Sequence, residues 1–193
     1  MINVYDFDKT IYDGDSSIDF YLYCLKRYPK IIILLPKQIF SFIKYKLKLE
    51  NKITFKQDFF SFFQLIPNLE EEITNFWSIN IKKIKAWYLE QKKSDDIIIS
   101  ASPEILLKPM IKLLKIKDVI ASNVSNTGLF LSNNCYGKEK VKRYKEKYNY
   151  VIENFFSDSY SDLPLAKISK NAFIVKKNKV VCWEVQDEKT NKK

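Results

Sequence analysis

Two aspartates one residue apart, Asp6 and Asp8, follow the first apolar segment of the chain. A second pair of acids, Asp158 and Asp162, follows another apolar segment near the other end. Carboxylates that converge in one place repel one another, so a cation or protons must compensate their charge. Hard carboxylate oxygens together with water suit Mg²⁺. If the fold brings these four acids together, they predict a magnesium site.

A hydroxyl and a lysine would complete the equipment for phosphoryl transfer. Ser100 ends the apolar run 97–99, and Lys138 and Lys140 lie in a basic stretch with helical spacing. A transferred phosphoryl group carries negative charge on its oxygens, which a metal ion, hydrogen-bond donors and a cation can neutralise. These residue types therefore favour phosphate chemistry, provided that the fold brings them to one place.

The composition excludes several other kinds of chemistry. The chain has 193 residues and no histidine, which removes Ser-His-Asp triads, Cys-His nucleophiles and histidine-bound zinc. Its three glycines lie too far apart for a dinucleotide fingerprint or a P-loop. Cys24, Cys135 and Cys182 are odd in number and widely spaced, which indicates reduced thiols rather than a disulfide framework.

Charge and hydropathy indicate a globular protein with a basic surface. The chain has 33 Lys and Arg residues against 23 Asp and Glu residues, a net charge of +10, and 46% of its residues are hydrophobic. No secretory signal is visible at the N-terminus. Lysines interrupt the most apolar stretch, 31–43, before it reaches the roughly 20 residues that a membrane span requires. We expect a cytoplasmic protein.

Strands must position the acids and the hydroxyl. Short apolar segments predict strands at residues 2–7, 97–99, 119–121, 155–156 and 173–175, with 180–185 as a hairpin partner. Helical segments alternate with these strands outside residues 16–93, which predicts an α/β fold with a parallel sheet. In such sheets the ligand site lies at the carboxyl ends of the strands, where Asp6, Ser100 and Asp158 stand.

Residues 16–93 differ in character, because aromatic and aliphatic residues recur there at helical spacing. We expect a helical cap in this range, inserted after the first strand. The sheet core would then consist of residues 1–15 and 94–187, and 188–193 would be a polar tail.

Local signals predict where several helices begin and break. Ser102, Pro103 and Glu104 read as the N-cap, first residue and first-turn acid of a helix, and Pro109 should kink or split that helix. Asn68 is expected to start another helix. Residues 126–128, 140–150 and 163–170 predict, in that order, a turn between two short strands, a helix and a short helix.

Four segments resemble the signature motifs of haloacid-dehalogenase-type phosphatases. Residues 6–10 match the DxDx[TV] signature. Residues 97–100 resemble the second motif, an apolar strand that ends in Ser or Thr. Residues 137–141 resemble the third, a lysine at a helix start, and 157–162 resemble the fourth, an Asp-x-x-x-Asp loop. All four occur in the family's order.

The resemblance implies a fold and a branch of the family. The implied fold is a Rossmann-like parallel sheet core with an inserted α-helical cap. The long insertion after the first motif is similar to the cap of the phosphoserine-phosphatase-like branch, subfamily IB. The segment from Ser100 to Glu104 is similar to that branch as well.

The resemblance also implies roles for the first two acids. Asp6 would be the nucleophile that attacks phosphorus and becomes an aspartyl-phosphate. Asp8 would be the general acid/base, which protonates the leaving oxygen and then activates water. An aspartate at position 8 favours phosphate over carbon–halogen chemistry, because a dehalogenase does not protonate an alkoxide.

Mg²⁺ is the implied cofactor. Its ligands would be Asp6, the main-chain carbonyl of Asp8 and Asp158, with Asp162 close by. Substrate-binding residues would be Ser100 and a lysine of the third motif, which hold the phosphoryl oxygens, together with Thr10 and Ala101. The lysine stands at Lys138 in one pattern of the family and at Lys140 in another; the second pattern fits more positions of this chain, so Lys140 is preferred.

The sequence therefore predicts a Mg²⁺-dependent phosphomonoester hydrolase that acts on phosphoserine or another small organic phosphate. Residues 26–48 leave an alternative, because they combine seven Lys and Arg residues with aromatic and aliphatic residues and contain no acid. Such a surface could serve a phosphatase of an amphipathic or lipid phosphate at a membrane. A second alternative is a non-catalytic phosphate- or RNA-binding protein on the same scaffold.

For residues 26–48 we expect that an apolar helix face is buried and that the lysines lie in water without membrane contact. No nucleic-acid partner is expected, because no recognised nucleic-acid motif occurs. The sequence carries no indication of the oligomeric state.

Overall fold

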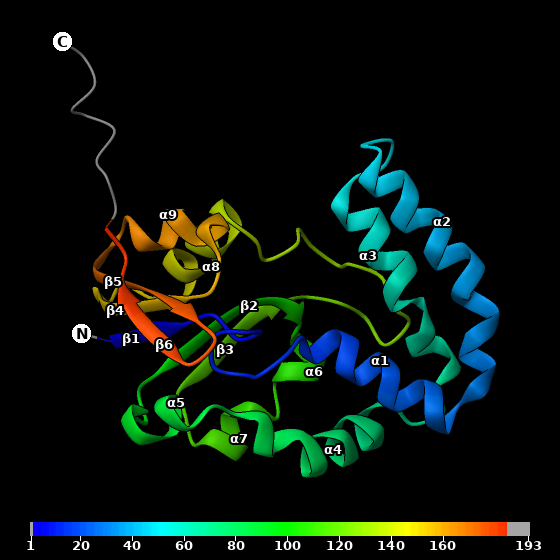
Figure 1. Ribbon diagram of the computed structural model, residues 1–193, viewed down its shortest axis with the longest axis horizontal. Helices are drawn as coiled ribbons and strands as arrows, with labels where there is room; N and C mark the ends of the chain where they lie inside the picture. Colours follow the sequence, from blue (N-terminus) through cyan, green and yellow to red (C-terminus); the bar gives the residue numbers. More distant parts are fainter. Residues whose placement is uncertain (1, 185–193) are drawn as a thin grey trace.

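The computed structural model describes residues 2–184, which form a sheet covered by helices (Figure 1). The sheet has six strands in the order β3-β2-β1-β4-β5-β6. The strands are β1 (Ile2–Tyr5), β2 (Ile97–Pro103), β3 (Asp118–Ser122), β4 (Ile152–Ser157), β5 (Ser169–Lys176) and β6 (Lys179–Cys182). The first five are parallel, and β6 returns antiparallel to β5. The predicted α/β fold is confirmed; the tail 188–193 lies outside the described residues.

The central strands β1 and β2 are almost completely buried because helices cover both faces of the sheet. Side chains alternate between the two faces along a strand. Val4 and Ile97 pack with α8 (Lys138–Lys147) and α9 (Leu163–Ala166). Tyr5 and Ile98 pack with α5 (Ala86–Gln91), α6 (Glu104–Leu107) and α7 (Met110–Leu114). Figure 1 shows α8 and α9 on one side of the sheet and α5 and α7 on the other.

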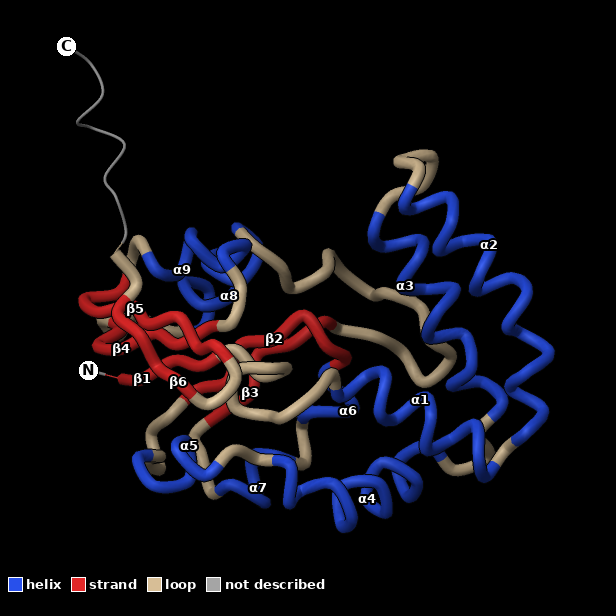
Figure 2. The backbone as a smooth tube through the Cα atoms, in the orientation of Figure 1, coloured by secondary structure: helices blue, strands red, loops and turns tan. Residues whose placement is uncertain are grey.

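The segment between β1 and β2 is helical, as its periodicity predicts (Figure 2). Before α5 it contains α1 (Ser16–Arg27), α2 (Leu35–Lys46), α3 (Lys52–Phe60) and α4 (Leu69–Asn80), with the 3₁₀ turns η1 (Pro29–Leu34), η2 (Ser61–Leu65) and η3 (Ile81–Lys83). Capping side chains fix three starts: Asp15 for α1, Asn51 for α3 and Asn68 for α4. The predicted helix start at Asn68 is thus confirmed.

One apolar cluster joins the helical segment to the sheet. It includes Phe20 and Trp77 from the insertion together with Tyr5 of β1 and Leu107 of α6. The indole Nε1 of Trp77 donates a hydrogen bond to the carbonyl of Leu106 at 2.7 Å. Because α5 also lies directly on the sheet, the insertion is anchored along its second half, and the division into cap and core at residue 93 stays a prediction.

The structure corrects the predicted helix start at Ser102. Ser102 belongs to β2, and α6 begins at Glu104 with Pro103 at the N-cap position. The strand continues because the Ser102 side chain is engaged elsewhere, as described below. The predicted break at Pro109 is confirmed, since this residue separates α6 from α7.

Three other local predictions need smaller corrections. The turn at 126–128 is present, but the two strands beside it reduce to one bridge between Val124 and Phe130. Gly128 has a φ of +87°, and a Cβ there would meet the Phe60 carbonyl oxygen at 2.2 Å, so this turn packs against the end of α3. Helix α8 begins two residues earlier than predicted and ends at Lys147, and α9 ends at Ala166 because β5 begins at Ser169.

The three cysteines are free thiols, as their spacing predicts. Within residues 2–184, no helix is both long enough and apolar enough to cross a membrane.

Candidate active site

The carboxyl ends of β1, β2 and β4 meet at one edge of the sheet. Their register pairs Tyr5 with Ile98 and with Phe156, so the residues that follow each strand converge. A cavity of about 360 Å³ lies there. Its lining includes the side chains singled out from the sequence, namely Asp6, Asp8, Ser100, Ala101, Lys140, Asp158 and Asp162.

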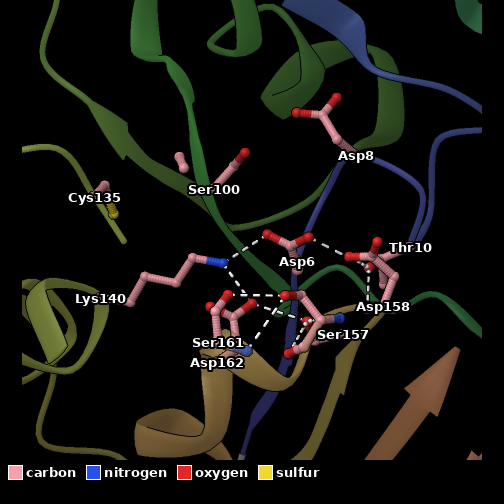
Figure 3. A network of polar contacts seen from close by, with 12 residues as sticks. Asp6, Asp8, Thr10, Ser100, Cys135, Lys140, Ser157, Asp158, Ser161 and Asp162 are labelled. Atoms are coloured by element: carbon pink, nitrogen blue, oxygen red, sulfur yellow. Dashed lines mark hydrogen bonds and ion pairs between the residues drawn. The ribbon is translucent and has the colours of Figure 1, made fainter. Parts of the chain in front are cut away.

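The Nζ of Lys140 reaches from one side of this group to two of its acids (Figure 3). Its Nζ donates to Asp6 Oδ1 at 2.6 Å and to Asp162 Oδ2 at 2.7 Å. The residue is 2% exposed, whereas Lys138, at the first position of α8, is exposed. Of the two candidate lysines, the fold therefore brings Lys140 into the cavity and leaves Lys138 outside it.

Burial and charge act against each other in this cluster. Burial disfavours the charged lysine, but the carboxylates of Asp6 and Asp162 outweigh it and raise the pKa of Lys140. Burial raises the pKa of Asp6 to about 7, although Lys140 opposes the shift. Burial also raises the pKa of Asp158. One lysine faces several acids, so the cluster favours the arrival of a further cation.

Asp8 lies apart from that cluster, as Figure 3 shows. Its Oδ1 accepts a hydrogen bond from the Ser16 main-chain N–H at 2.6 Å, and its Oδ2 accepts one from the Ser102 hydroxyl. Burial raises the pKa of Asp8 to about 6, and the charge of Asp15 adds to this shift. A carboxyl group with such a pKa can give and take a proton near neutral pH.

Thr10 is completely buried and lies behind the carboxylates rather than in the cavity lining. Its Oγ1 donates to Asp6 Oδ2 at 3.3 Å and accepts a hydrogen bond from the Asp158 main-chain N–H at 2.9 Å. The fold therefore does not bring Thr10 into the cavity lining, and its predicted substrate contact stays a prediction. Thr10 is a positioning residue that ties the loop after β1 to the loop after β4.

Ser100 and Ala101 both line the cavity, and their contact with substrate stays a prediction. Ser100 is 1% exposed, lines the cavity, and its Oγ accepts a hydrogen bond from the Ser102 main-chain N–H at 3.1 Å. The Ala101 carbonyl accepts hydrogen bonds from Lys56 Nζ at 2.7 Å and from the Ser122 hydroxyl at 3.0 Å. These bonds fix the backbone of β2 where a substrate would lie.

A comparison with protein families agrees with this geometry. The profile of the haloacid dehalogenase-like hydrolases matches residues 4–167, a range that runs from β1 to the end of α9 and contains all four motifs. The chain belongs to this family. The resemblance carried by the four motifs is thus confirmed, and with it the expectation of a hydrolase.

Solved structures share the haloacid dehalogenase fold with this chain. A protein of unknown function from Bordetella pertussis Tohama I has a TM-score of 0.74 at 14% sequence identity, and the match covers 89% of this chain and 87% of that chain. A HAD family hydrolase from Salmonella enterica serovar Typhi has a TM-score of 0.59 at 11% identity, covering 87% and 60%. A phosphoserine phosphohydrolase-like protein from Francisella tularensis has a TM-score of 0.51 at 15% identity, covering 89% and 86%. At these identities the likeness shows the fold alone. No protein in a search of curated sequences matches the chain.

The metal that this hydrolase family implies fits the donors present. Asp6, Asp158 and the carbonyl of Asp8 offer hard oxygens, and Asp162 Oδ1 is buried with no hydrogen-bond partner among the described residues. Across residues 2–184, no three acidic or cysteine side chains are placed as a complete metal site. Hard oxygens such as these are the ligands that Mg²⁺ takes in proteins, together with water.

Ser102 is a site residue that the sequence analysis assigned to a helix cap. Its hydroxyl donates to Asp8 Oδ2 and lies 3.1 Å from the Ser17 hydroxyl. The sequence holds only a partial signal for this role. Ser102 stands two residues after Ser100, and both line the cavity, but the pairing of β2 with β3 is irregular between Ile99 and Pro103, so strict alternation of side chains does not place them.

The helix α3 forms a second wall that the four motifs do not include. Lys52, Phe55, Lys56 and Phe59 line the cavity, and their spacing places them on one helix face. Lys56 Nζ donates to the Ala101 carbonyl and, at 3.0 Å, to Asn134 Oδ1. Burial lowers the pKa of Lys56 to about 8. This haloacid dehalogenase-like hydrolase therefore faces its cavity with cations and aromatic rings from the insertion.

Proposed function

We propose that the protein is a Mg²⁺-dependent phosphomonoester hydrolase that acts through an aspartyl-phosphate on Asp6. The observation that carries the proposal is the position of Lys140, whose buried Nζ lies between Asp6 and Asp162 at the cavity. A buried cation beside a buried carboxylate provides both a nucleophile and a group that neutralises phosphoryl charge. The family match supports a hydrolase, and the separate Asp8 supports acid–base chemistry.

The first half of the reaction transfers the phosphoryl group to Asp6. A carboxylate oxygen of Asp6 forms a bond to phosphorus, and the bond from phosphorus to the leaving oxygen breaks. Asp8 gives its proton to that oxygen, so the leaving group departs as a neutral alcohol. Lys140 and Ser100 donate hydrogen bonds to the phosphoryl oxygens, and Mg²⁺ would neutralise part of their charge when bound at Asp6, Asp158 and the Asp8 carbonyl.

The second half returns Asp6 to its starting state. Asp8, now a carboxylate, takes a proton from water as the water oxygen attacks phosphorus. The bond between phosphorus and Asp6 breaks, and inorganic phosphate leaves. Asp8 needs no large movement between the halves, because the Ser16 N–H and the Ser102 hydroxyl hold both of its oxygens.

The α3 wall supports a small anionic substrate. A cavity of about 360 Å³ suits a small molecule. Lys56 donates to two neutral groups, and Lys52 Nζ lies 3.4 Å from the centre of the Tyr136 ring. Both ammonium groups can therefore bind an anionic group on the leaving alcohol. Phosphoserine is such a substrate, and the Francisella tularensis protein of the same fold is named phosphoserine phosphohydrolase-like. We also propose a cytoplasmic location, which the three free cysteines fit because thiols stay reduced there.

The test is hydrolysis of p-nitrophenyl phosphate and of phosphoserine by the purified protein, with Mg²⁺ and with EDTA. We expect turnover that EDTA abolishes and Mg²⁺ restores, and no turnover by Asp6→Asn. Asp13→Asn is the matched control, because Asp13 is an exposed acid just after the same motif. Wild-type rates in Asp6→Asn, or undiminished rates in EDTA, would refute the proposal.

A further inference from the structure

Helix α2 has the opposite orientation to an ordinary surface helix, because it buries polar side chains and exposes apolar ones. Its two buried residues are polar, Gln38 and Ser41. Its exposed side chains include large apolar ones, such as Phe40 at 59% and Ile43 at 47% exposure. The expectation that residues 26–48 bury their apolar face is therefore wrong for α2. Surface helices normally face the core with their apolar side, so this orientation requires a physical reason.

Hydrogen bonds specify the orientation. Gln38 Oε1 accepts from the Tyr21 hydroxyl at 2.8 Å, and Gln38 Nε2 donates to the Phe59 carbonyl at 3.0 Å. The Ser41 hydroxyl donates to Glu50. If α2 rotated to bury its apolar side, these buried polar groups would lose their partners, at a cost that apolar burial elsewhere would have to offset. The outward apolar face is thus built into the sequence.

The outward side chains form one continuous face. Ile39, Phe40, Ile43 and Leu47 lie at helical spacing on the side opposite Gln38 and Ser41. All four are exposed, and Ile32 and Ile33 of η1 are exposed just before them. In Figures 1 and 2, α2 lies at the outer edge of the molecule, with α3 between it and the sheet. An apolar face this large on a soluble surface marks a contact site.

Lysines border this face. Lys44 Nζ lies 4.6 Å from the centre of the Phe40 ring, and Lys46 Nζ lies 5.4 Å from that of Phe42. From Lys26 to Leu49 the chain contains no Asp or Glu. A second copy of the chain seated on this face would bring lysines against lysines. An anionic lipid surface instead offers phosphates to the lysines and acyl chains to the apolar side chains.

We propose that η1 and α2 form a docking surface for anionic membranes, on which the apolar face enters the headgroup boundary and the bordering lysines contact lipid phosphates. The contact is peripheral, consistent with a helix of 12 residues that lies in the plane of the surface. Lysine stems are long enough to keep the ammonium group among the phosphates while Phe40 and Ile43 enter the boundary.

Vesicle sedimentation tests the proposal. Wild type should pellet with vesicles of phosphatidylcholine mixed with phosphatidylglycerol and far less with phosphatidylcholine alone. Phe40→Ser/Ile43→Ser should weaken binding at least about tenfold through lost apolar contact. Lys44→Gln/Lys46→Gln should weaken it about fivefold per lysine at low salt and less at high salt. Ile79→Ser/Leu113→Ser is the matched control, because these side chains are equally exposed on α4 and α7.

Three results would overturn the proposal. Wild type could remain in the supernatant with vesicles at physiological and at low salt. The control variant could lose binding as much as Phe40→Ser/Ile43→Ser. In analytical ultracentrifugation without vesicles, the wild type could be a dimer that Phe40→Ser/Ile43→Ser converts to a monomer. The last result would assign the face to a second copy. The vesicle measurement needs no turnover, so its failure would not bear on the phosphatase chemistry.

Discussion

The cavity and the η1–α2 surface both carry lysines, but their lysines have opposite surroundings. Lys140 and Lys56 are enclosed at the cavity, where one contacts two carboxylates and the other contacts neutral oxygens. Lys44 and Lys46 lie over aromatic rings on the outside of α2. The role of a lysine in this protein therefore depends on the groups that it contacts rather than on its presence in a basic stretch.

Replacing the buried lysine of α8 should give the largest effect. Lys140→Met should lower kcat/KM for p-nitrophenyl phosphate about 10³-fold, because it removes a cation from the phosphoryl oxygens. It should also lower Tm, since Asp6 and Asp162 would be left without their buried partner. Lys138→Met, at an exposed position of the same helix, is the control and should change neither quantity. Equal losses in both variants would remove the distinction between buried and exposed lysines.

A second comparison sets Lys56 on α3 against Lys44 on α2. Lys56→Met should raise KM for phosphoserine about tenfold or more while kcat changes little, because in the proposed binding mode the charge contacts the leaving group and not the phosphoryl group. Lys44→Gln should leave both constants unchanged. Steady-state kinetics on the two variants provide the check, and a KM unaffected by Lys56→Met would remove the anionic-substrate argument.

The lowered pKa of Lys56 should also make the free energy of unfolding depend on pH. Its pKa is lowered in the folded protein to about 8, so the unfolded chain binds the proton more tightly. Between pH 8 and the ordinary lysine pKa near 10.4, stability should rise with pH because the folded lysine is already neutral. Lys56→Met should therefore raise the free energy of unfolding at pH 7, on the order of 1 kcal/mol, and gain less at pH 10. Thermal melts at both pH values measure the difference.

The smallest expected effect concerns two buried serines that both donate to a carboxylate. Ser102 donates to Asp8 at the cavity, and Ser41 donates to Glu50 beside α2. The Ser102 hydrogen bond lowers the pKa of Asp8 against the effect of burial. Ser102→Ala should therefore reduce kcat several-fold and move the limb of the pH–rate profile due to Asp8 to higher pH. Ser41→Ala should lower Tm, because Glu50 loses a hydrogen bond, and should leave the pH–rate profile unchanged. A profile unchanged by Ser102→Ala would leave Ser102 a structural residue.

The strand-end residues were predictable, and the orientation of α2 was not, for a physical reason. Asp6, Ser100 and Asp158 follow apolar strands, and a parallel sheet brings strand ends together whatever the detailed packing. The choice of Lys140 over Lys138 was also within reach, because the family pattern that places the lysine at position 140 fits more positions of this chain. The contacts of Gln38 and Ser41 depend on Tyr21, Phe59 and Glu50, which the fold brings to them from three other segments.

Ser102 and the α3 wall lie between these extremes. The two-residue spacing from Ser100 to Ser102 was visible, but Ser-Pro-Glu is also a strong helix-start signal, and local propensity favoured the cap. The aromatic and basic face of α3 was visible as a pattern, but nothing in its spacing says whether it faces water, protein or substrate. The folded structure decides this, because Lys52 and Phe55 line the same cavity as Asp6 and Ser100.

The central claim is that Asp6 carries the phosphoryl group during turnover. Wild-type protein, turning over phosphoserine or p-nitrophenyl phosphate with Mg²⁺, can be quenched in acid, digested and examined by mass spectrometry. The account predicts one phosphoryl group on the N-terminal peptide at Asp6, and none on that peptide from Asp6→Asn. Active protein with an unmodified Asp6 at every quench time, or a phosphoryl group on another residue that persists in Asp6→Asn, would contradict it.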